Sequence, residues 1–471
     1  MFMLWLRSGW RGTGVERLSG ALDAVRKFMG KPWVRWLVLG LFVVQAVTLV
    51  FVVNIGTPPD EQNNIDFIQY YAQHSLSPVF DHQAPTYSLG DKTREVDYLY
   101  HYGMSLVVRV LPFSSSTDYR IIRLFSVVFA VLSFVVLARV LKRLGTSAAV
   151  ITVCLLVITN LPMVLLLGSA INNDVMVWLG MGLGLLLILR LSEKAGLLDM
   201  VWLLALCCLG GLVKRTLLPF CLLFGIWGLL IGLRHWRVLV AQIRPLKWPL
   251  LAVAIVAIVG LGLFTERVGG NLVRYGSVQV SCEQVDGESA CYNFWTNVRA
   301  RSLANLPSEK MLPLPFFVVR WFSDSFFNIV DIQTQYWKHV VRPARLLTPL
   351  LAAVLVVGLA YGAFYEKQRF RHDAVSRHRV YVMAVAFTYI FVQLAVNFGT
   401  YRHYKVYGIA LNGRYIIPSL LPLIGMAGLY WSHLLKHHVR LLTLLAICLV
   451  VFTIGGSGLL MMLRNSQLYA G

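Results

Sequence analysis

The sequence predicts an all-α polytopic membrane protein with about eleven transmembrane helices and two large outward loops that carry interfacial helices. Hydrophobic residues make up 57% of the 471 residues, and charged residues only 14%. Mean hydropathy is +0.66. Apolar runs of span length recur along the chain, and about 20 such residues cross a hydrocarbon core of about 30 Å as a helix. This pattern excludes a soluble protein.

The chain opens with residues 1–33, which mix several basic residues with two acids. This composition predicts an amphipathic cytoplasmic segment that lies on anionic lipid. The first apolar run, 34–53, has full span length and no small-residue cleavage site after it. We therefore expect a retained helix and a cytoplasmic N-terminus.

The least obvious feature of the later spans is Lys214-Arg215, which interrupts a long apolar stretch. A single helix there would place two cations near the bilayer centre, at about 2.5–3.5 kcal/mol each. We therefore expect two spans that meet at Lys214. The spans predicted after the first are 121–141, 148–167, 173–191, 199–213, 216–233, 248–265, 346–365, 380–398, 415–432 and 441–461.

With two spans that meet at Lys214, the basic loops lie on the inner side of the membrane and the acidic residues concentrate on the outer side. The formal net charge of +21 thus mostly describes membrane orientation and gives no reason to invoke nucleic acid. The predicted organisation is a first group of spans over 34–265 with an outer loop at 54–120, a second outer loop at 266–345, and the last spans over 346–471. We expect an integral protein of the inner (plasma) membrane.

The two outer loops have distinct compositions. The first loop contains a predicted helix from Glu61 to Ser75 and an amphipathic stretch at 98–111, and the second contains an aromatic run at 316–327. Aromatic residues mixed with single charges favour helices that lie in the membrane interface. Cys282 and Cys291 lie in a polar part of the second loop, where they could form a local disulfide. A zinc pair is disfavoured because no His lies nearby.

Two adjacent acids, Asp60 and Glu61, follow the first span directly in the stretch Gly56-Thr-Pro-Pro-Asp-Glu61. One interpretation is structural, because Pro58-Pro59 ends one helix and Asp60 can cap the next. The other is chemical, with the pair acting as base and as metal or substrate ligand at the membrane surface. The stretch alone leaves both open.

Further polar residues cluster at outward span ends. Asp174 follows Asn173 at the start of a span, where an acid also favours the helix dipole. Lys214 and Arg215 could snorkel to the surface or hold a phosphate. Arg402, and then Arg414-Tyr415, lead into the span at 415–432, which carries two prolines that loosen the helix.

The order of these motifs resembles the GT-C superfamily of integral-membrane glycosyltransferases, which includes protein O-mannosyltransferases and lipid A aminoarabinose transferases. Two matching motifs are Pro-Pro-Asp-Glu after the first predicted span and Asn-Asn-Asp at the start of the fourth predicted span. The other two are Lys-Arg-Thr between the fifth and sixth spans and Gly-Arg-Tyr-Ile-Ile-Pro near the end of the chain. The resemblance covers residues 34 to about 430. It implies a polyprenyl-phosphate-linked sugar donor, a cavity at the outer membrane surface and an acceptor that is a lipid, a glycan or a protein.

The resemblance also implies roles for individual residues. Asp60 matches the catalytic base, Glu61 a metal ligand or orienting group, and Asp174 a second acid. The expected phosphate ligands are Lys214, Arg215, Arg414 and Tyr415, and the expected cavity residues are His101, Tyr102, Asn173 and Arg402. The sequence departs from the Asp-x-Asp form of some members, so a divalent metal ion is left open and no other cofactor is expected.

A transporter or flippase of a lipid-linked saccharide is the competing class. It could use the same cations to hold a phosphate and leave the acids as helix caps. Transporters tend to place charge at the bilayer midplane and to show internal repeats. The sequence shows neither, which favours the transferase.

Overall fold

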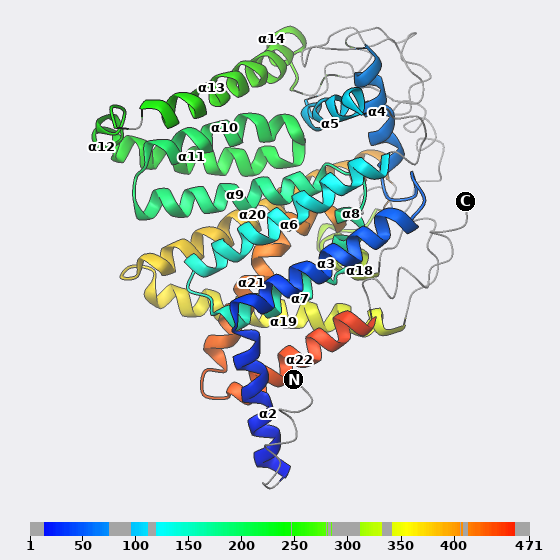
Figure 1. Ribbon diagram of the computed structural model, residues 1–471, viewed down its shortest axis with the longest axis vertical. Helices are drawn as coiled ribbons and strands as arrows, with labels where there is room; N and C mark the ends of the chain where they lie inside the picture. Colours follow the sequence, from blue (N-terminus) through cyan, green and yellow to red (C-terminus); the bar gives the residue numbers. More distant parts are fainter. Residues whose placement is uncertain are drawn as a thin grey trace.

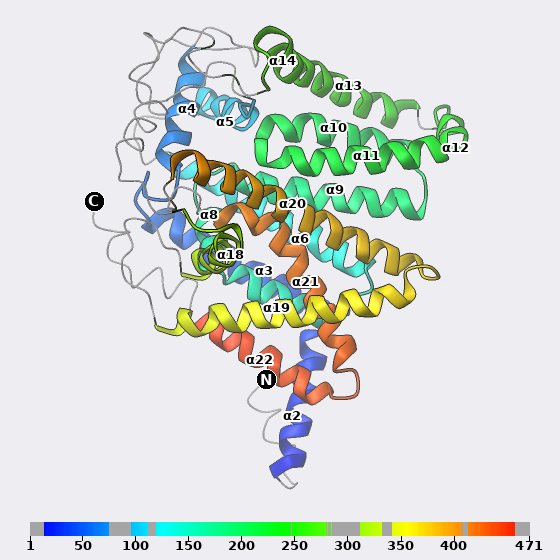
Figure 2. The same ribbon diagram turned by 180° about the vertical axis from the view of Figure 1, so that it is seen from behind.

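The structure is a computed structural model that describes residues 14–74, 96–111, 119–245, 247–278, 280, 284, 311–331, 342–405, 407 and 413–456. Every regular element within these residues is helical (Figures 1 and 2). Eight of the described helices are long and apolar enough to cross a membrane, and one bent pair would make a ninth. The described part is thus a polytopic α-helical membrane protein, and the number of eleven spans stays a prediction.

The helices follow the predicted order. Up to residue 275 the helices are α2 (Gly14–Met29), α3 (Pro32–Val52), α4 (Glu61–His74), α5 (Leu99–Val110), α6 (Arg120–Arg143), α7 (Ala148–Thr159), α8 (Pro162–Gly168), α9 (Asp174–Glu193), α10 (Leu197–Val213), α11 (Leu218–Arg234), α12 (Trp236–Ala241), α13 (Lys247–Phe264) and α14 (Gly270–Tyr275). The last of these, α14, lies within the stretch predicted as the second outer loop. The later ones are α18 (Leu314–Asp331), α19 (Arg342–Arg369), α20 (Ala374–Tyr404), α21 (Ile417–Leu434) and α22 (Val439–Gly456).

Helix α21 lies in the middle of the bundle (Figure 1). Its most apolar window is 78% buried, against 22% for that of α11, which therefore belongs to the periphery. It contacts α6, α7, α9, α19, α20 and α22. Because α21 follows Arg414 directly through a short 3-10 turn, η5 (Gly413–Ile416), the most buried of the described span-length helices positions that arginine.

The span predicted over 148–167 corresponds to a bent pair of helices, α7 and α8. The chain bends by 75° between α7 and α8. Pro162 begins α8 and has no N–H to continue the helical ladder of α7. Asn160 stabilises the break, since its amide donates to the carbonyl of Leu156 at 2.8 Å and its side-chain oxygen accepts from Gln45 at 3.3 Å.

The predicted interruption at Lys214 is confirmed. Helix α10 ends at Val213, Lys214 is extended, and the 3-10 turn η2 (Arg215–Leu217) leads into α11. The two helices lie side by side in both views (Figures 1 and 2). The cations at 214 and 215 therefore lie at helix ends rather than inside a helix.

The three helical stretches predicted in the loops at 54–120 and 266–345 are present. Helix α4 begins at Glu61 as expected, and α5 covers the amphipathic stretch; the two pack together. The aromatic run forms α18, which packs against η5. The contact is so close that a Cβ on Gly413 would lie 2.2 Å from the backbone oxygen of Ser325. Only glycine fits there.

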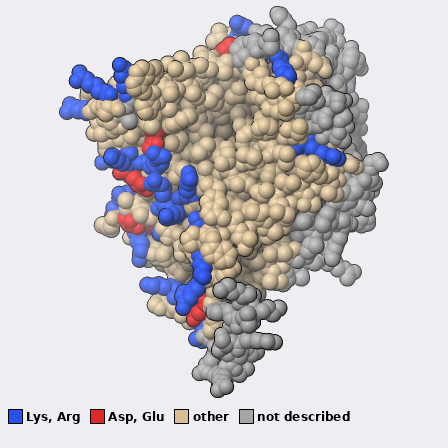
Figure 3. All heavy atoms as spheres, viewed as in Figure 1, with Lys and Arg blue, Asp and Glu red and all other residues tan. Residues whose placement is uncertain are grey.

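The amphipathic helix α2 covers part of the predicted cytoplasmic segment, and its axis lies at an angle to that of α3 (Figure 1). Helix α2 packs against α7 and α22. It is therefore part of the helix bundle, in addition to its predicted place on the membrane surface. In the space-filling view, Lys and Arg gather along the left edge, at the helix ends that the sequence places inside (Figure 3). The orientation in the membrane stays a prediction.

Candidate functional site

Five of the predicted site residues meet at one end of the bundle. Asp60 comes from the α3–α4 connection, Asp174 from the start of α9, Lys214 from the end of α10, and Arg414 and Tyr415 from η5. We call these five the charged cluster. Its acids and bases come from four separate parts of the chain, so the fold and not local sequence brings them together.

Arg414 lies at the centre of the charged cluster and is buried. Its Nη2 donates to a carboxylate oxygen of Asp60 and, at 3.1 Å, to the hydroxyl of Tyr415. Its Nε lies 3.7 Å from Oδ2 of Asp174. Among the described residues, Nε and Nη1 of Arg414 and Oδ2 of Asp174 have no hydrogen-bond partner. The guanidinium thus joins two acids and keeps two donors unused.

Lys214 is held by the start of α9. Its Nζ donates to Oδ1 of Asp174 at 2.6 Å and to Oδ1 of Asn173 at 2.7 Å, and it lies 5.5 Å from the ring centroid of Tyr415. The amide of Asn173 in turn donates to the carbonyl of Val213 at 3.4 Å. The side chain of Lys214 is only 10% exposed. It therefore does not snorkel to the surface, and its charge is neutralised by Asp174.

Asp60 is the exposed acid of the charged cluster. Its side chain is 49% exposed, against 4% for Asp174. The backbone of Asp60 has a φ of +60°, a left-handed conformation that non-glycine residues seldom adopt and that Asp and Asn tolerate best. Such outliers concentrate at functional sites. One side of the carboxylate thus meets solvent and the other meets Arg414.

Glu61 has a different environment from its neighbour and is fully buried. Its Oε1 accepts from Nε of Arg123 and from the backbone N–H of Ile171, both at 2.8 Å. Its Oε2 accepts from Nη2 of Arg123 at 2.6 Å and from the backbone N–H of Gly56 at 2.8 Å. These four bonds occupy the acceptor positions of a carboxylate. The geometry therefore favours the orienting role over the metal-ligand role.

The sequence interpretation missed Arg123, the partner of Glu61. Arg123 lies inside the predicted span 121–141, and its Nη1 and Nη2 also donate to the carbonyls of Val50, Val53 and Asn54 at 2.7–3.0 Å. It thereby satisfies carbonyls at the C-terminal end of α3. A usable signal was present, because an arginine within a span requires a partner.

Arg215 does not join the charged cluster. Its Nε lies 3.4 Å from Oδ1 of Asp97, a buried acid next to the start of α5, and its side chain is 39% exposed. The adjacent Tyr98 packs its ring 4.7 Å from the guanidinium of Arg267. Burial raises the pKa of Tyr98 to about 12, although Arg267 opposes that shift. Arg215 therefore belongs to a neighbouring group around α5.

The expected cavity residues are dispersed. His101 is buried and its Nε2 lies 2.9 Å from Oδ1 of Asn64, whose amide donates to the carbonyl of Ile171 at 2.8 Å. These bonds tie α5 to α4 and to the turn before α9. Tyr102 packs edge-on against Tyr71, with 6.2 Å between ring centroids. Arg402 is exposed near the end of α20. Of the four expected cavity residues, Asn173 contacts the charged cluster.

Cys282 and Cys291 lie outside the described residues, so their disulfide stays a prediction. Within the described residues no group of three or more His, Cys, Asp or Glu is arranged to hold a metal ion. The candidate ligands do not fit one either, because Glu61 is saturated with N–H donors and Asp174 is paired with Lys214.

Comparison of the chain with protein-family models, curated proteins and solved structures gave no match.

Proposed function

We propose that the protein is a membrane glycosyltransferase that moves a sugar from a polyprenyl-phosphate donor to an acceptor hydroxyl on the outer face of the membrane. The observation that supports this proposal is the contact between the exposed carboxylate of Asp60 and the buried guanidinium of Arg414. A proton acceptor open to solvent then lies directly beside a cation with unused donors, at the end of a membrane-spanning bundle.

Transfer of the sugar needs the carboxylate of Asp60 and the guanidinium of Arg414 close together. The acceptor oxygen attacks C1 of the sugar while its proton passes to Asp60, and the bond from C1 to the phosphate oxygen breaks. The electron pair leaves with the polyprenyl phosphate, whose charge increases in the transition state. A positioned carboxylate contributes about 10²–10⁴ in rate as a general base. A guanidinium stabilises the departing phosphate through charge-assisted hydrogen bonds.

The charged cluster is formally neutral, because two acids face two bases. A donor phosphate adds negative charge and competes with Asp60 for Arg414. Because Nε and Nη1 of Arg414 are buried, the phosphate reaches them when Asp60 or Tyr415 moves aside. A carboxylate that loses an arginine partner binds a proton more tightly. Donor binding would thus prepare Asp60 to act as the base.

The test is Asp60→Asn in purified protein reconstituted in nanodiscs, with a panel of polyprenyl-phosphate sugars. Asparagine tolerates the left-handed backbone and caps helices as well as aspartate, but it cannot take a proton. Asp66→Asn on α4 is the matched control, since Asp66 is a half-buried acid that accepts from Gln62 at 2.8 Å. Chromatography measures release of free polyprenyl phosphate, and a separate assay measures donor binding.

We expect Asp60→Asn to slow release by about 10²–10⁴ with donor binding largely retained, and Asp66→Asn to behave as wild type. Normal release by Asp60→Asn would exclude Asp60 as the base. With the same protein in sealed vesicles, movement of the intact donor across the membrane without release of polyprenyl phosphate would instead identify a flippase.

A further inference from the structure

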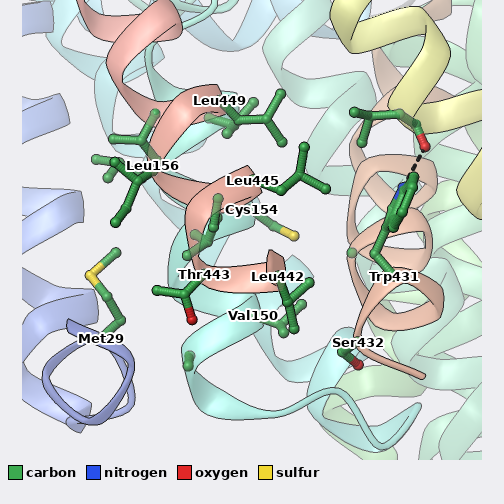
Figure 4. A pocket seen from close by; sticks show the side chains of 18 of the residues that line it. Met29, Val150, Cys154, Leu156, Trp431, Ser432, Leu442, Thr443, Leu445 and Leu449 are labelled. Carbon is green, nitrogen blue, oxygen red and sulfur yellow. Dashed lines mark hydrogen bonds between the residues drawn. The ribbon is translucent and has the colours of Figure 1, made fainter. Parts of the chain in front are cut away.

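A large apolar cavity lies outside the charged cluster, and Figure 4 shows the side chains of its wall. Its volume is about 540 Å³, and its walls come from α2, α7, α19, α21 and α22. Pockets that hold a small molecule have about 300–1,000 Å³. The cavity therefore has the size of a ligand site.

The cavity lies at the opposite end of α21 from Arg414. Its wall includes Trp431 and Ser432, about 17 residues after Arg414, which corresponds to about 25 Å of helix. On α22 the lining extends from Val439 to Val451, a helical length of about 18 Å. That length is close to half of the bilayer core of about 30 Å. The lining of the cavity thus extends along α22 for a length comparable to the thickness of one leaflet.

Three uncharged polar side chains of the wall already donate hydrogen bonds to the backbone. Thr443 donates its hydroxyl to the carbonyl of Val439 at 2.9 Å, Ser432 donates to that of Leu429 at 2.6 Å, and the Trp431 indole donates to that of Val354 at 2.8 Å. The last bond is drawn in Figure 4. The remaining labelled lining is aliphatic or sulfur-containing, as at Met29, Leu156 and Leu445. The wall therefore suits a hydrocarbon chain and offers little to a polar ligand.

Two exposed cations belong to the lining, Arg26 of α2 and Lys436 after α21. Neither forms an ion pair within the described residues. Basic residues at the ends of transmembrane helices attract anionic lipid headgroups. The length of the apolar lining fits one hydrocarbon chain, and the two cations favour a negative charge next to it. The ligand that matches both features is an amphiphile with a hydrocarbon chain and a nearby negative charge.

We propose that this cavity binds one acyl chain of an anionic glycerophospholipid, with the phosphate between Arg26 and Lys436. The bound chain fills the space between α2, α7 and α22. The lipid then links the amphipathic helix α2 to the membrane-spanning bundle. This site is independent of the proposed glycosyl transfer.

The test uses the purified full chain exposed to vesicles of equal parts phosphatidylglycerol and phosphatidylcholine with identical acyl chains. Native mass spectrometry then counts the lipids retained. We expect phosphatidylglycerol to be retained several-fold over phosphatidylcholine, and the double variant Arg26→Gln, Lys436→Gln to lose that preference. The matched control is Lys367→Gln, Arg371→Gln, which removes two exposed cations from the end of α19 and the turn that follows it. This control should retain the preference.

A second variant keeps both charges and fills the cavity. Ala446→Trp places a large side chain in the lining, and we expect it to retain no phosphatidylglycerol. Equal retention of both lipids by the wild type, or equal retention by the double variant and its control, would overturn the proposal. Decaprenyl phosphate added to the vesicles is a competitor, and its retention in place of phosphatidylglycerol would show that a different lipid occupies the site.

Discussion

Arg123 and Glu61 form a doubly bonded ion pair in which neither side chain is exposed to solvent. The pair joins α6 to the first turn of α4, and its remaining bonds reach the end of α3, Gly56 and Ile171. The α3–α4 connection is therefore fixed from both sides. Asp60 lies one residue before Glu61, so its unusual backbone conformation is held by this pair.

Breaking this pair should destabilise the protein strongly. Glu61→Gln leaves the Arg123 guanidinium buried without a counter-charge, which typically costs about 3–5 kcal/mol. Glu193→Gln is the matched control, because its partner Arg143 and Glu193 itself are 36% and 42% exposed. An exposed pair is worth about 0–1 kcal/mol. Unfolding of both variants in detergent measures the difference, and similar transition temperatures would contradict the structural role of Glu61.

The two acids of the charged cluster, Asp60 and Asp174, should differ in how much their loss destabilises the protein in the same unfolding assay. Asp174→Asn removes the counter-charge of the buried Lys214 and should cost about 3–5 kcal/mol. Asp60→Asn affects an acid that is half exposed, so its cost should be much smaller. A larger loss of stability for Asp60→Asn would reverse the roles that we give these residues.

Arg414 should be irreplaceable by lysine. Arg414→Lys keeps the charge but presents one compact ammonium, which cannot contact Asp60, Tyr415 and a phosphate together. We expect the affinity for decaprenyl phosphate in nanodiscs to fall about 10-fold or more, and further for Arg414→Ala. Arg402→Lys is the control, since Arg402 is exposed and forms no ion pair within the described residues. Unchanged affinity in both Arg414 variants would exclude Arg414 as the phosphate ligand.

The orientation of the bundle can be tested at the two ends of α11. A cysteine at Arg215, which is 39% exposed, should react with a membrane-impermeant maleimide in intact cells. A cysteine at Arg234, exposed at the other end of the helix, should react only after permeabilisation. The background variant lacks reactive native cysteines. The reverse labelling pattern would place the charged cluster on the inner side.

Some features of the site follow from sequence because their cause is local. The cost of burying two cations predicted the break at Lys214, and the Pro58-Pro59 pair predicted the start of α4. The grouping of Asp60, Asp174, Lys214 and Arg414 at one end follows from counting spans. These inferences need only chain order and the thickness of a bilayer.

The partners within the site could not be predicted in the same way. Asp60 and Arg414 are 354 residues apart, and Glu61 meets Arg123 through the packing of α3 against α6. Which base reaches which acid depends on helix packing that apolar runs do not encode. The bend before Pro162 was missed because hydropathy alone does not detect a proline within an apolar stretch.

The contact between Gly413 and the backbone of Ser325 has a mechanical consequence. No side chain separates α18 from η5 at this point, so a displacement of α18 moves the backbone of Gly413 directly, and Arg414 is the next residue. Helix α18 also presents Phe316 and Val319, which are 68% and 71% exposed, to its surroundings. A molecule that binds α18 and displaces it would therefore move the guanidinium of Arg414 without contacting it. Helix α18 would then couple binding at its exposed face to the position of Arg414 in the charged cluster.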